Sequence, residues 1–469
     1  MSSTRVTLLA IFLLALGVRL AYLQSDPRPL FGPWLEGGIA HNIVDDGHWF
    51  EVNTHAYDFD PTTLDLRSHL IQPADVDLKY ADAHPHWQPE IGEPVGEALV
   101  LAGLWETTGS ETFLPEQILR IVLDALTALL VYWIALQLFK RRRAAVLAAV
   151  FYAIYPPVAW QTVSPYLDFW AIDLTIAILA MQIKAARSTH RWRWLIACGL
   201  LVGAGTYFRP FVLVLSAILA VILNLPAGWR TALIRALATT AVALLLTIPW
   251  TIRNYDEFHT FVPFRSGLGQ TMWEGLGDVH NDFGGTFTAQ STIAMVRRER
   301  PGLVVESFAW DGYLKHKAVS VIEQHPLFYA KLLAYRTLIA TLWSYSPSWM
   351  HGVAVSPFAY ARGPLALAFA RPLDVLEAAL EPAVFLLAML GLGLSWRRRR
   401  NANIVLIATV LATIVPYIVL HMDHRYVIPA SFAYLIWSAL GLDLLAEAFA
   451  SRLKMRRGRA LEPSPAAVA

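Results

Sequence analysis

Long apolar runs alternate with polar connections along the chain, and each run is compatible with one membrane-crossing helix. Most runs approach the ~20 residues that an α-helix needs to cross the hydrocarbon of a bilayer. The predicted spans are Val6 to Leu23, Ile118 to Phe139, Ala144 to Tyr155, Phe169 to Ile183, Trp194 to Phe208, Phe211 to Leu225, Ala236 to Trp250, Ala378 to Trp396, Ile404 to Leu420 and Val427 to Leu442. The pattern therefore predicts an all-α polytopic membrane protein with about ten transmembrane helices.

Two long polar segments interrupt this series, from Gln24 to about Glu116 and from Thr251 to about Glu377. In the second segment, Lys331 and Arg336 interrupt an apolar stretch from Leu327 to Trp343, which predicts an amphipathic interfacial helix. A pair of extra spans there would give twelve crossings instead of ten. The predicted units are 1–250, a transmembrane module with its first loop at about 24–116; 251–377, a second large loop with interfacial helices; 378–446, the C-terminal transmembrane helices; and 447–469, a basic tail.

The composition excludes an ordinary water-soluble protein, because 56% of the 469 residues are hydrophobic and only 16% are charged. A net charge of +2 gives no indication of nucleic-acid binding. The single cysteine, Cys198, lies inside an apolar run, which excludes a disulfide framework or a thiolate metal cluster.

Basic residues gather in every second connection, which is the positive-inside pattern of membrane proteins. This pattern predicts that both termini are cytoplasmic and that both long loops are extracytoplasmic. The first span is expected to remain as an anchor, because Arg19 interrupts its end and the residues from Ser25 to Pro27 offer no small-residue cleavage site. The basic clusters are Lys140 to Arg143, Arg187 to Arg193, Arg230 to Arg235, Arg397 to Arg400 and Arg452 to Arg459.

The first loop opens with a short predicted helix from Trp34 to Asp46, which Gly47 ends. Glu36 shares a stripe of this helix with apolar residues such as Ile39 and Ile43. Two interpretations follow. Glu36 reaches the lipid headgroups from a membrane-surface helix, or it is a general base whose proton affinity is raised by partial desolvation.

A second acidic group lies near the end of the same loop, among proline and glycine residues. Its spacing does not match a helical two-histidine metal motif, so a zinc site is the weaker interpretation. Solvated loop charges are the alternative, and they suit Glu90 and Glu97 better than Glu93. The members of the group are His84, His86, Glu90, Glu93 and Glu97.

Three arginines break the positive-inside pattern, because the topology assigns them to the outer membrane surface. Arg209 ends one span, Arg253 follows another, and Arg425 precedes the last. Each could extend separately to lipid headgroups or pair with Asp256 or Asp423. Guanidinium groups also suit phosphate oxygens, so three on one side favour a site for an anionic lipid head.

These pieces, in this order, resemble glycosyltransferase family 39 and related bacterial membrane transferases, the group that contains protein mannosyltransferases and the lipid A aminoarabinose transferase. The resemblance is weak and covers most of the chain. It is carried by the Arg19-bearing first span, Glu36 to Ile43 leading to Gly47-His48-Trp49, Glu93-Pro94-Val95-Gly96, Tyr155-Pro156-Pro157, Arg209-Pro210, Pro249-Trp250 with Arg253-Asn254-Tyr255, and Arg425-Tyr426.

The resemblance implies the GT-C fold, in which a large first outer loop packs on a helical bundle and shapes an outward-facing cavity. It also implies that sugar is taken from a polyprenyl phosphate donor, with inversion, after an acidic loop residue deprotonates the acceptor. Better-known members begin the loop helix with an Asp-Glu pair, and Gly32 and Pro33 occupy those positions here. Glu36 is the substitute that we expect, then Glu93, and then Asp45 or Asp46.

The sequence therefore predicts a membrane glycosyltransferase of a bacterial-type inner membrane, acting at the extracytoplasmic face. The expected partners are membrane lipids and a polyprenyl phosphate-sugar, while the acceptor is left open among protein, lipid and polysaccharide. No cofactor is predicted, although the loop carboxylates leave room for a divalent metal. The alternatives are a transporter or flippase of lipid-linked saccharide and a non-catalytic GT-C-like subunit.

Overall fold

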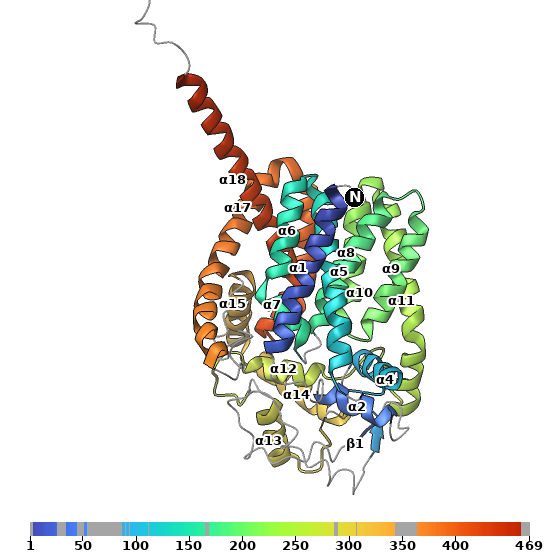
Figure 1. The fold of residues 1–469 in the computed structure, drawn as a ribbon. Coiled ribbons are helices and arrows are strands. Elements are labelled where there is room, and N and C mark those ends of the chain that lie inside the picture. Colours follow the sequence, from blue (N-terminus) through green and yellow to red (C-terminus); the bar gives the residue numbers. More distant parts are fainter. Residues whose placement is uncertain are drawn as a thin grey trace, which may run out of the picture.

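The computed structural model describes residues 3–25, 34–44, 51–53, 87–89, 91–92, 94–110, 112–164, 168–285, 289–305, 307–342 and 364–460. In this part of the chain the secondary structure is almost entirely helical (Figure 1). The exception is one antiparallel pair of short strands, β1 (Glu51–Asn53) and β2 (Trp87–Pro89), in which Val52 lies opposite Gln88. This pair joins two separate segments of the first long loop.

A bundle of helices makes up the larger part of the molecule (Figure 1). Each predicted span falls on one of these helices, so the apolar pattern located them correctly. Their bounds are α1 (Ser3–Ser25), α5 (Leu114–Phe139), α6 (Arg142–Ile154), α7 (Pro156–Val163), α8 (Asp168–Arg187), α9 (Arg191–Thr206), α10 (Phe211–Asn224), η3 (Leu225–Ala227), α11 (Trp229–Phe258), α17 (Pro364–Leu420), η4 (His424–Ala430) and α18 (Ser431–Ala460).

By length and apolar character, six of the helices in the described ranges are able to cross a membrane, or seven if the bent pair α6 and α7 forms one span. The bend between α6 and α7 is 49°, and it follows from Pro156 and Pro157, which lack the backbone donors needed to continue α6. Helix α17 contains two predicted spans. They are separated at Arg399, where the backbone leaves helical geometry. Helix α10 is shorter, with 14 residues.

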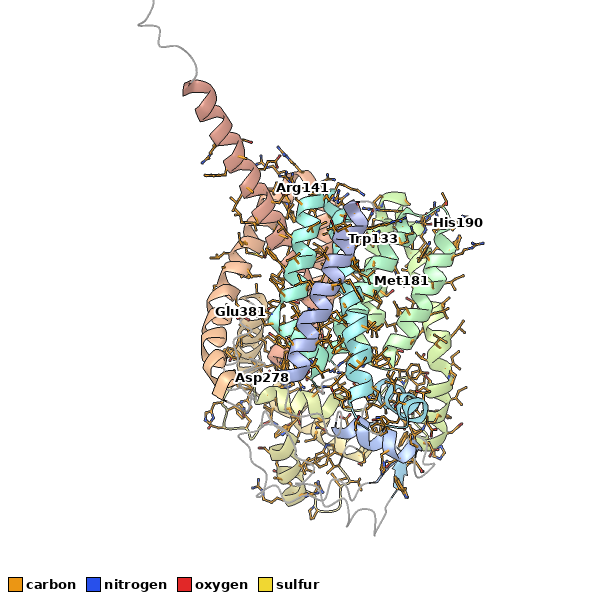
Figure 2. The ribbon with its side chains drawn as sticks, in the orientation of Figure 1. Trp133, Arg141, Met181, His190, Asp278 and Glu381 are labelled. Carbon is orange, nitrogen blue, oxygen red and sulfur yellow. The ribbon has the colours of Figure 1, made fainter. Side chains whose placement is uncertain are left out.

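The basic connections gather at one end of the bundle. Arg141 and His190 lie at the end that also carries the N-terminus, whereas Asp278 lies toward the opposite end (Figure 2). Arg141 precedes α6 and pairs with Asp443 and Glu447 of α18, at 2.5 and 2.6 Å. The grouping agrees with the alternation of basic clusters along the sequence.

Shorter helices form a layer at the opposite end of the bundle (Figure 1). They come from the two long polar segments, and their buried aromatic residues Trp273 and Trp310 form a core separate from that of the bundle. This outer layer consists of α2 (Trp34–Val44), α4 (Gly96–Thr108), α12 (Leu268–Leu276), α13 (Ala289–Glu299) and α14 (Phe308–Gln324).

Helix α15 (Pro326–Leu342) corresponds to the predicted interfacial helix, but it runs beside α17 (Figure 1). Arg336, which suggested a surface position, is fully buried and donates 2.7 Å from Nε to Asp278. Arg336 therefore does not mark an exposed side of this helix, because a distant carboxylate neutralises the guanidinium.

Buried charges tie α1 to the bundle. Arg19, fully buried, pairs with Asp124 of α5 and donates to the backbone oxygens of Tyr152 and Ala153 in α6. The Tyr152 hydroxyl donates to the other oxygen of Asp124 at 2.6 Å. Because an unpaired buried charge is costly, this network fixes α1 against α5 and α6.

Glycines allow α17 and α18 to pack closely. A Cβ atom on Gly391 would overlap the carbonyl oxygen of Trp437, and one on Gly441 would lie 2.5 Å from that of Leu387. Close backbone approach at small residues is a usual way for membrane helices to associate. The contact holds α18 against α17.

Candidate functional site

Asp168 is the first residue of α8 and lies at the centre of the candidate site. Its side chain is 1% exposed, and its Oδ1 atom accepts a hydrogen bond from Nη2 of Arg209 at 2.7 Å. A carboxylate is favoured at a helix N-terminus, because the backbone N–H groups there carry partial positive charge. Asp168 therefore suits its position in the helix while pairing with a cation from the turn between α9 and α10.

Arg425 approaches the same carboxylate from η4. Its Nε atom lies 3.7 Å from Oδ2 of Asp168 and 2.9 Å from Oδ2 of Asp423. Asp423 also caps η4 by accepting from the backbone N of Arg425. The predicted pairing with Asp423 is thus present, and two of the three predicted arginines meet at one carboxylate.

Aromatic rings surround this charge cluster. Tyr417 and Tyr426 stack with ring centroids 4.4 Å apart, and Cζ of Arg425 lies 5.3 Å from the Tyr426 ring. The rings restrict the side-chain rotamers of the arginines and lower the local dielectric, which strengthens ionic contacts.

Arg209 keeps unused hydrogen-bonding capacity. Its buried Nε atom has no hydrogen-bond partner among the described residues. Burial acts to lower the pKa of the guanidinium, but Asp168, Tyr417 and Tyr426 together act in the opposite direction, and the pKa lies above its usual value. Arg209 is therefore a charged group with one buried donor that Asp168 does not use.

Arg253 lies elsewhere. Its Cζ atom is 4.9 Å from the Trp250 ring and 5.6 Å from the Phe258 ring, and its Nη1 donates to Asn254 at 3.1 Å. The structure does not place Arg253 on Asp168. Two of the three predicted arginines, Arg209 and Arg425, therefore share a carboxylate, and a role for Arg253 at the same site stays a prediction.

A small cleft lies beside the turn that carries Arg209, and no sequence pattern indicated it. Arg265, from the extended segment after α11, lines it together with apolar and hydroxyl-bearing side chains. Residues on both sides of Arg209 contribute. The lining is Pro94, Val95, Thr206, Tyr207, Pro210, Thr247, Trp250, Pro263, Phe264 and Arg265.

Helix α2, which carries Glu36, is joined to this region through α4. Ile39 and Ala40 of α2 pack with Ala98 and Leu101 of α4. The first residue of α4, Gly96, donates its backbone N–H to the oxygen of Tyr207 at 2.8 Å, two residues before Arg209. The described part of the chain includes the backbone of Glu36, but not its side chain.

The remaining predicted loop residues fall mostly outside the described ranges. Glu93 does so, and so do the further candidates Asp45 and Asp46. The histidines and glutamate proposed as a weak zinc site, His84, His86 and Glu90, also lie there. Within the described part, no group of three or more side chains suited to a metal ion is present.

Glu97 is not a solvated loop charge, contrary to the interpretation favoured by its loop sequence. It is fully buried on the first turn of α4 and pairs with Arg120 of α5. Arg120 also pairs with Glu116 at 2.8 Å and donates to the backbone oxygen of Ser164 at 2.9 Å. Glu97 therefore holds α4 on the bundle.

Asp168 is the residue of the candidate site that sequence reasoning missed. Its signal was an acid at the start of an apolar run, on the same side as the outlying arginines. A single acid in that position is ordinary for a helix N-terminus. Only the fold shows that Arg209, 41 positions away, and Arg425 both reach it.

Comparison with known proteins agrees with this architecture. Residues 93–252 match the family model of dolichyl-phosphate-mannose-protein mannosyltransferase. The matched segment contains both Asp168 and Arg209. It leaves out α2 and the C-terminal helices.

Curated relatives are undecaprenyl phosphate-α-4-amino-4-deoxy-L-arabinose arabinosyl transferases. The protein of Pectobacterium carotovorum is 33% identical over 153 residues, which are 29% of this chain and 26% of the relative. That of Pectobacterium atrosepticum is 29% identical over 181 residues, 34% of this chain and 32% of the relative. The match thus spans about a third or less of these relatives.

The oligosaccharyltransferase AglB of Archaeoglobus fulgidus, solved with an inhibitory peptide and a dolichol-phosphate, is similar over nearly the whole chain. Its TM-score is 0.53 at 15% identity, covering 99% of this chain and 53% of AglB. This chain has the GT-C fold.

Proposed function

We propose that this GT-C protein transfers a sugar from a polyprenyl phosphate donor to an acceptor at the extracytoplasmic membrane face. The observation that carries the proposal is the convergence of Arg209 and Arg425 on Asp168. Two guanidinium groups from distant parts of the chain, at one end of a membrane-spanning bundle, suit the phosphate of a lipid carrier.

Asp168 has a positioning role in this proposal. Without a carboxylate between them, the two guanidinium groups would repel one another, and their side chains would separate. Each guanidinium has five N–H donors, so contact with Asp168 or Asp423 leaves donors for phosphate oxygens.

The comparisons support the class of donor. The curated relatives are named as transferases that use an undecaprenyl phosphate-linked sugar. A related archaeal structure was solved with a dolichol-phosphate, and another with Zn and sulfate. The relatives are matched over a limited length, so donor sugar and acceptor are proposed here by class only.

The chemistry divides between the carboxylates and the arginines. A loop carboxylate, Glu36 first and Glu93 second, removes the proton of the acceptor hydroxyl. The hydroxyl oxygen then forms a bond to the anomeric carbon as the bond from that carbon to the phosphate oxygen breaks, with inversion. Negative charge on the leaving lipid phosphate is stabilised by Arg209 and Arg425.

The test is turnover by the purified full-length protein with radiolabelled polyprenyl phosphate sugars. We expect release of free polyprenyl phosphate without an energy source, which also argues against a transporter. The Arg209→Gln and Arg425→Gln variants should release at least about tenfold less, because each loses a charge-assisted contact.

Arg298→Gln is the matched control, since Arg298 is an exposed residue of α13 in the outer layer. It should retain wild-type turnover. No release with any polyprenyl phosphate sugar, or equal release by Arg425→Gln, would overturn the proposal.

A further inference from the structure

One buried carboxylate joins the outer layer to the loop that carries Arg425. Asp278, just beyond α12, is 3% exposed and accepts hydrogen bonds from three directions. Arg336 Nε lies 2.7 Å from Oδ2, the His421 ring Nδ1 lies 2.7 Å from Oδ1, and the backbone N of Met422 donates to Oδ2 at 3.0 Å. Asp278 is thus the meeting point of α12, α15 and the segment after α17.

Arg336 extends this junction to the end of α17. Its Nη1 donates to the backbone oxygens of Ile418 and Val419, both at 3.0 Å, and its Nη2 donates to that of Gly275 in α12. The oxygens of Ile418 and Val419 belong to the last turn of α17, whose carbonyl groups lack partners within the helix. Arg336 therefore ends α17 and fixes the direction in which the chain leaves it.

The chain that leaves α17 reaches Arg425 within a few residues. His421 is followed by Met422 and by Asp423, which caps η4 and contacts Arg425 Nε at 2.9 Å. A displacement of His421 and Met422 would therefore move Arg425 relative to Asp168. None of the junction residues contacts the Asp168 carboxylate.

We propose that Asp278, Arg336 and His421 form a pH-sensitive latch that positions Arg425 for its ligand. The proposal rests on the proposed function for the identity of that ligand, the phosphate of a polyprenyl carrier. The latch consists of contacts within the protein, so it is tested without the ligand. Asp278 and Arg336 are positioning residues, because they act on the site through the backbone.

The charges around His421 set the direction of the pH dependence. Burial acts to lower the pKa of His421, but the hydrogen bond and the charge of Asp278 outweigh it, and the pKa is raised. A raised pKa in the folded protein stabilises the latch fully below the unfolded-state pKa, and this contribution is lost as the pH rises through the folded-state pKa. The ionisable groups that act on or contact His421 are Glu274 and Asp278 at the end of α12, and Asp423 and Tyr426 of its own segment. Tyr335 and Arg336 of α15 act on Asp278, and Arg425 pairs with Asp423.

Hydrogen exchange of the full-length protein in lipid nanodiscs tests the latch directly. In Asp278→Asn, the backbone amides of residues 418–426 should exchange at least about tenfold faster than in the wild type, because the anionic acceptor is lost. The matched control is Asp311→Asn. Asp311 accepts from the backbone N atoms of Gly269 and Gln270 at the other end of α12. This control should leave 418–426 unchanged.

The pH dependence of the latch is tested with a substitution of His421. Protection of residues 418–426 in the wild type, corrected for intrinsic exchange, should fall as the pH rises above the usual range of histidine. His421→Gln should remove this fall. Unchanged protection in Asp278→Asn, or the same pH dependence in His421→Gln, would overturn the latch.

Turnover separates this inference from the proposed function. If the wild type releases polyprenyl phosphate, Asp278→Asn should raise the KM for the donor more than it lowers kcat, because binding of the phosphate is affected. A proportional fall in kcat with an unchanged KM would count against positioning. An inactive wild type contradicts the proposed function instead, and the exchange result then decides the latch alone.

Discussion

At the scale of single residues, the site depends on how one carboxylate is shared. Asp168 is nearly inaccessible and contacts two cations that come from separate connections of the bundle. Removing the negative charge of Asp168 leaves the two guanidinium groups close together with less negative charge to neutralise them. The carboxylate is therefore expected to determine both the stability of this region and the geometry of the arginines.

The substitution Asp168→Asn should lower thermal stability and reduce donor turnover at least about tenfold, because like charges are left facing one another in a partly buried site. Thermal unfolding in detergent and the turnover assay measure the two effects. Asp256→Asn is the control, since Asp256 is exposed on α11. Full activity of Asp168→Asn would remove Asp168 from the site.

Glu36→Gln tests the proposed base. Turnover should fall by ~10²- to 10⁴-fold, the usual contribution of a general base, while expression and lipid binding are kept. The same substitution at Glu93 provides the comparison between the two candidate carboxylates. Wild-type turnover in Glu36→Gln would exclude Glu36 from catalysis.

Sequence reasoning reached part of this site. The positive-inside pattern marked Arg209 and Arg425 as exceptions, because charge in a connection is readable without a fold. Asp168 was missed, and Arg253 was grouped with the others, because pairing between residues far apart in the chain is set by helix packing. Glu97 was misjudged for the same reason, since its partner Arg120 lies on another helix.

At the scale of elements, helix positions follow from apolar run length, and their contacts follow from small residues and buried ion pairs. The ten predicted spans all fall on helices. The start of α17 at Pro364 was not foreseen. Burial of Arg336 in α15 was not foreseen either, because its partner Asp278 lies 58 residues away. The three-residue strands are too short to give a pattern.

Two glycines of α17 test the packing against α18. Gly391→Ala should destabilise the protein by about 1–3 kcal/mol, because the added Cβ overlaps the Trp437 oxygen and forces the helices apart. Gly393→Ala is the control two positions later, where a Cβ meets nothing within 4 Å. Thermal unfolding of both variants in detergent is the measurement. Equal transition temperatures would contradict the close packing.

At the scale of the whole molecule, the bundle separates a basic end from the end that holds the site. Arg141 and His190 mark the basic end, and Asp278 lies toward the other (Figure 2). The positive-inside rule then predicts that the basic end faces the cytoplasm. The site and the outer layer would face outward, where a lipid-linked donor meets its acceptor.

Cysteine labelling tests this orientation, because Cys198 is the sole cysteine and is buried. In a Cys198→Ala background, a membrane-impermeant maleimide applied to intact bacterial spheroplasts should label His280→Cys and leave Thr189→Cys unlabelled. Both positions are exposed in the structure. Permeabilised membranes provide the control, in which both label. Labelling at Thr189→Cys alone in intact spheroplasts would show that the orientation is opposite to the predicted one.

The central claim is that two arginines bind the phosphate of a polyprenyl carrier, and equilibrium binding tests it most directly. Purified full-length protein in nanodiscs is titrated with polyprenyl phosphate and with the matching polyprenol. The phosphate should bind at least about tenfold more tightly, and this preference should weaken with salt and disappear in the Arg209→Gln, Arg425→Gln double variant. Equal binding of the two lipids, or a preference that survives in the double variant, would contradict the account.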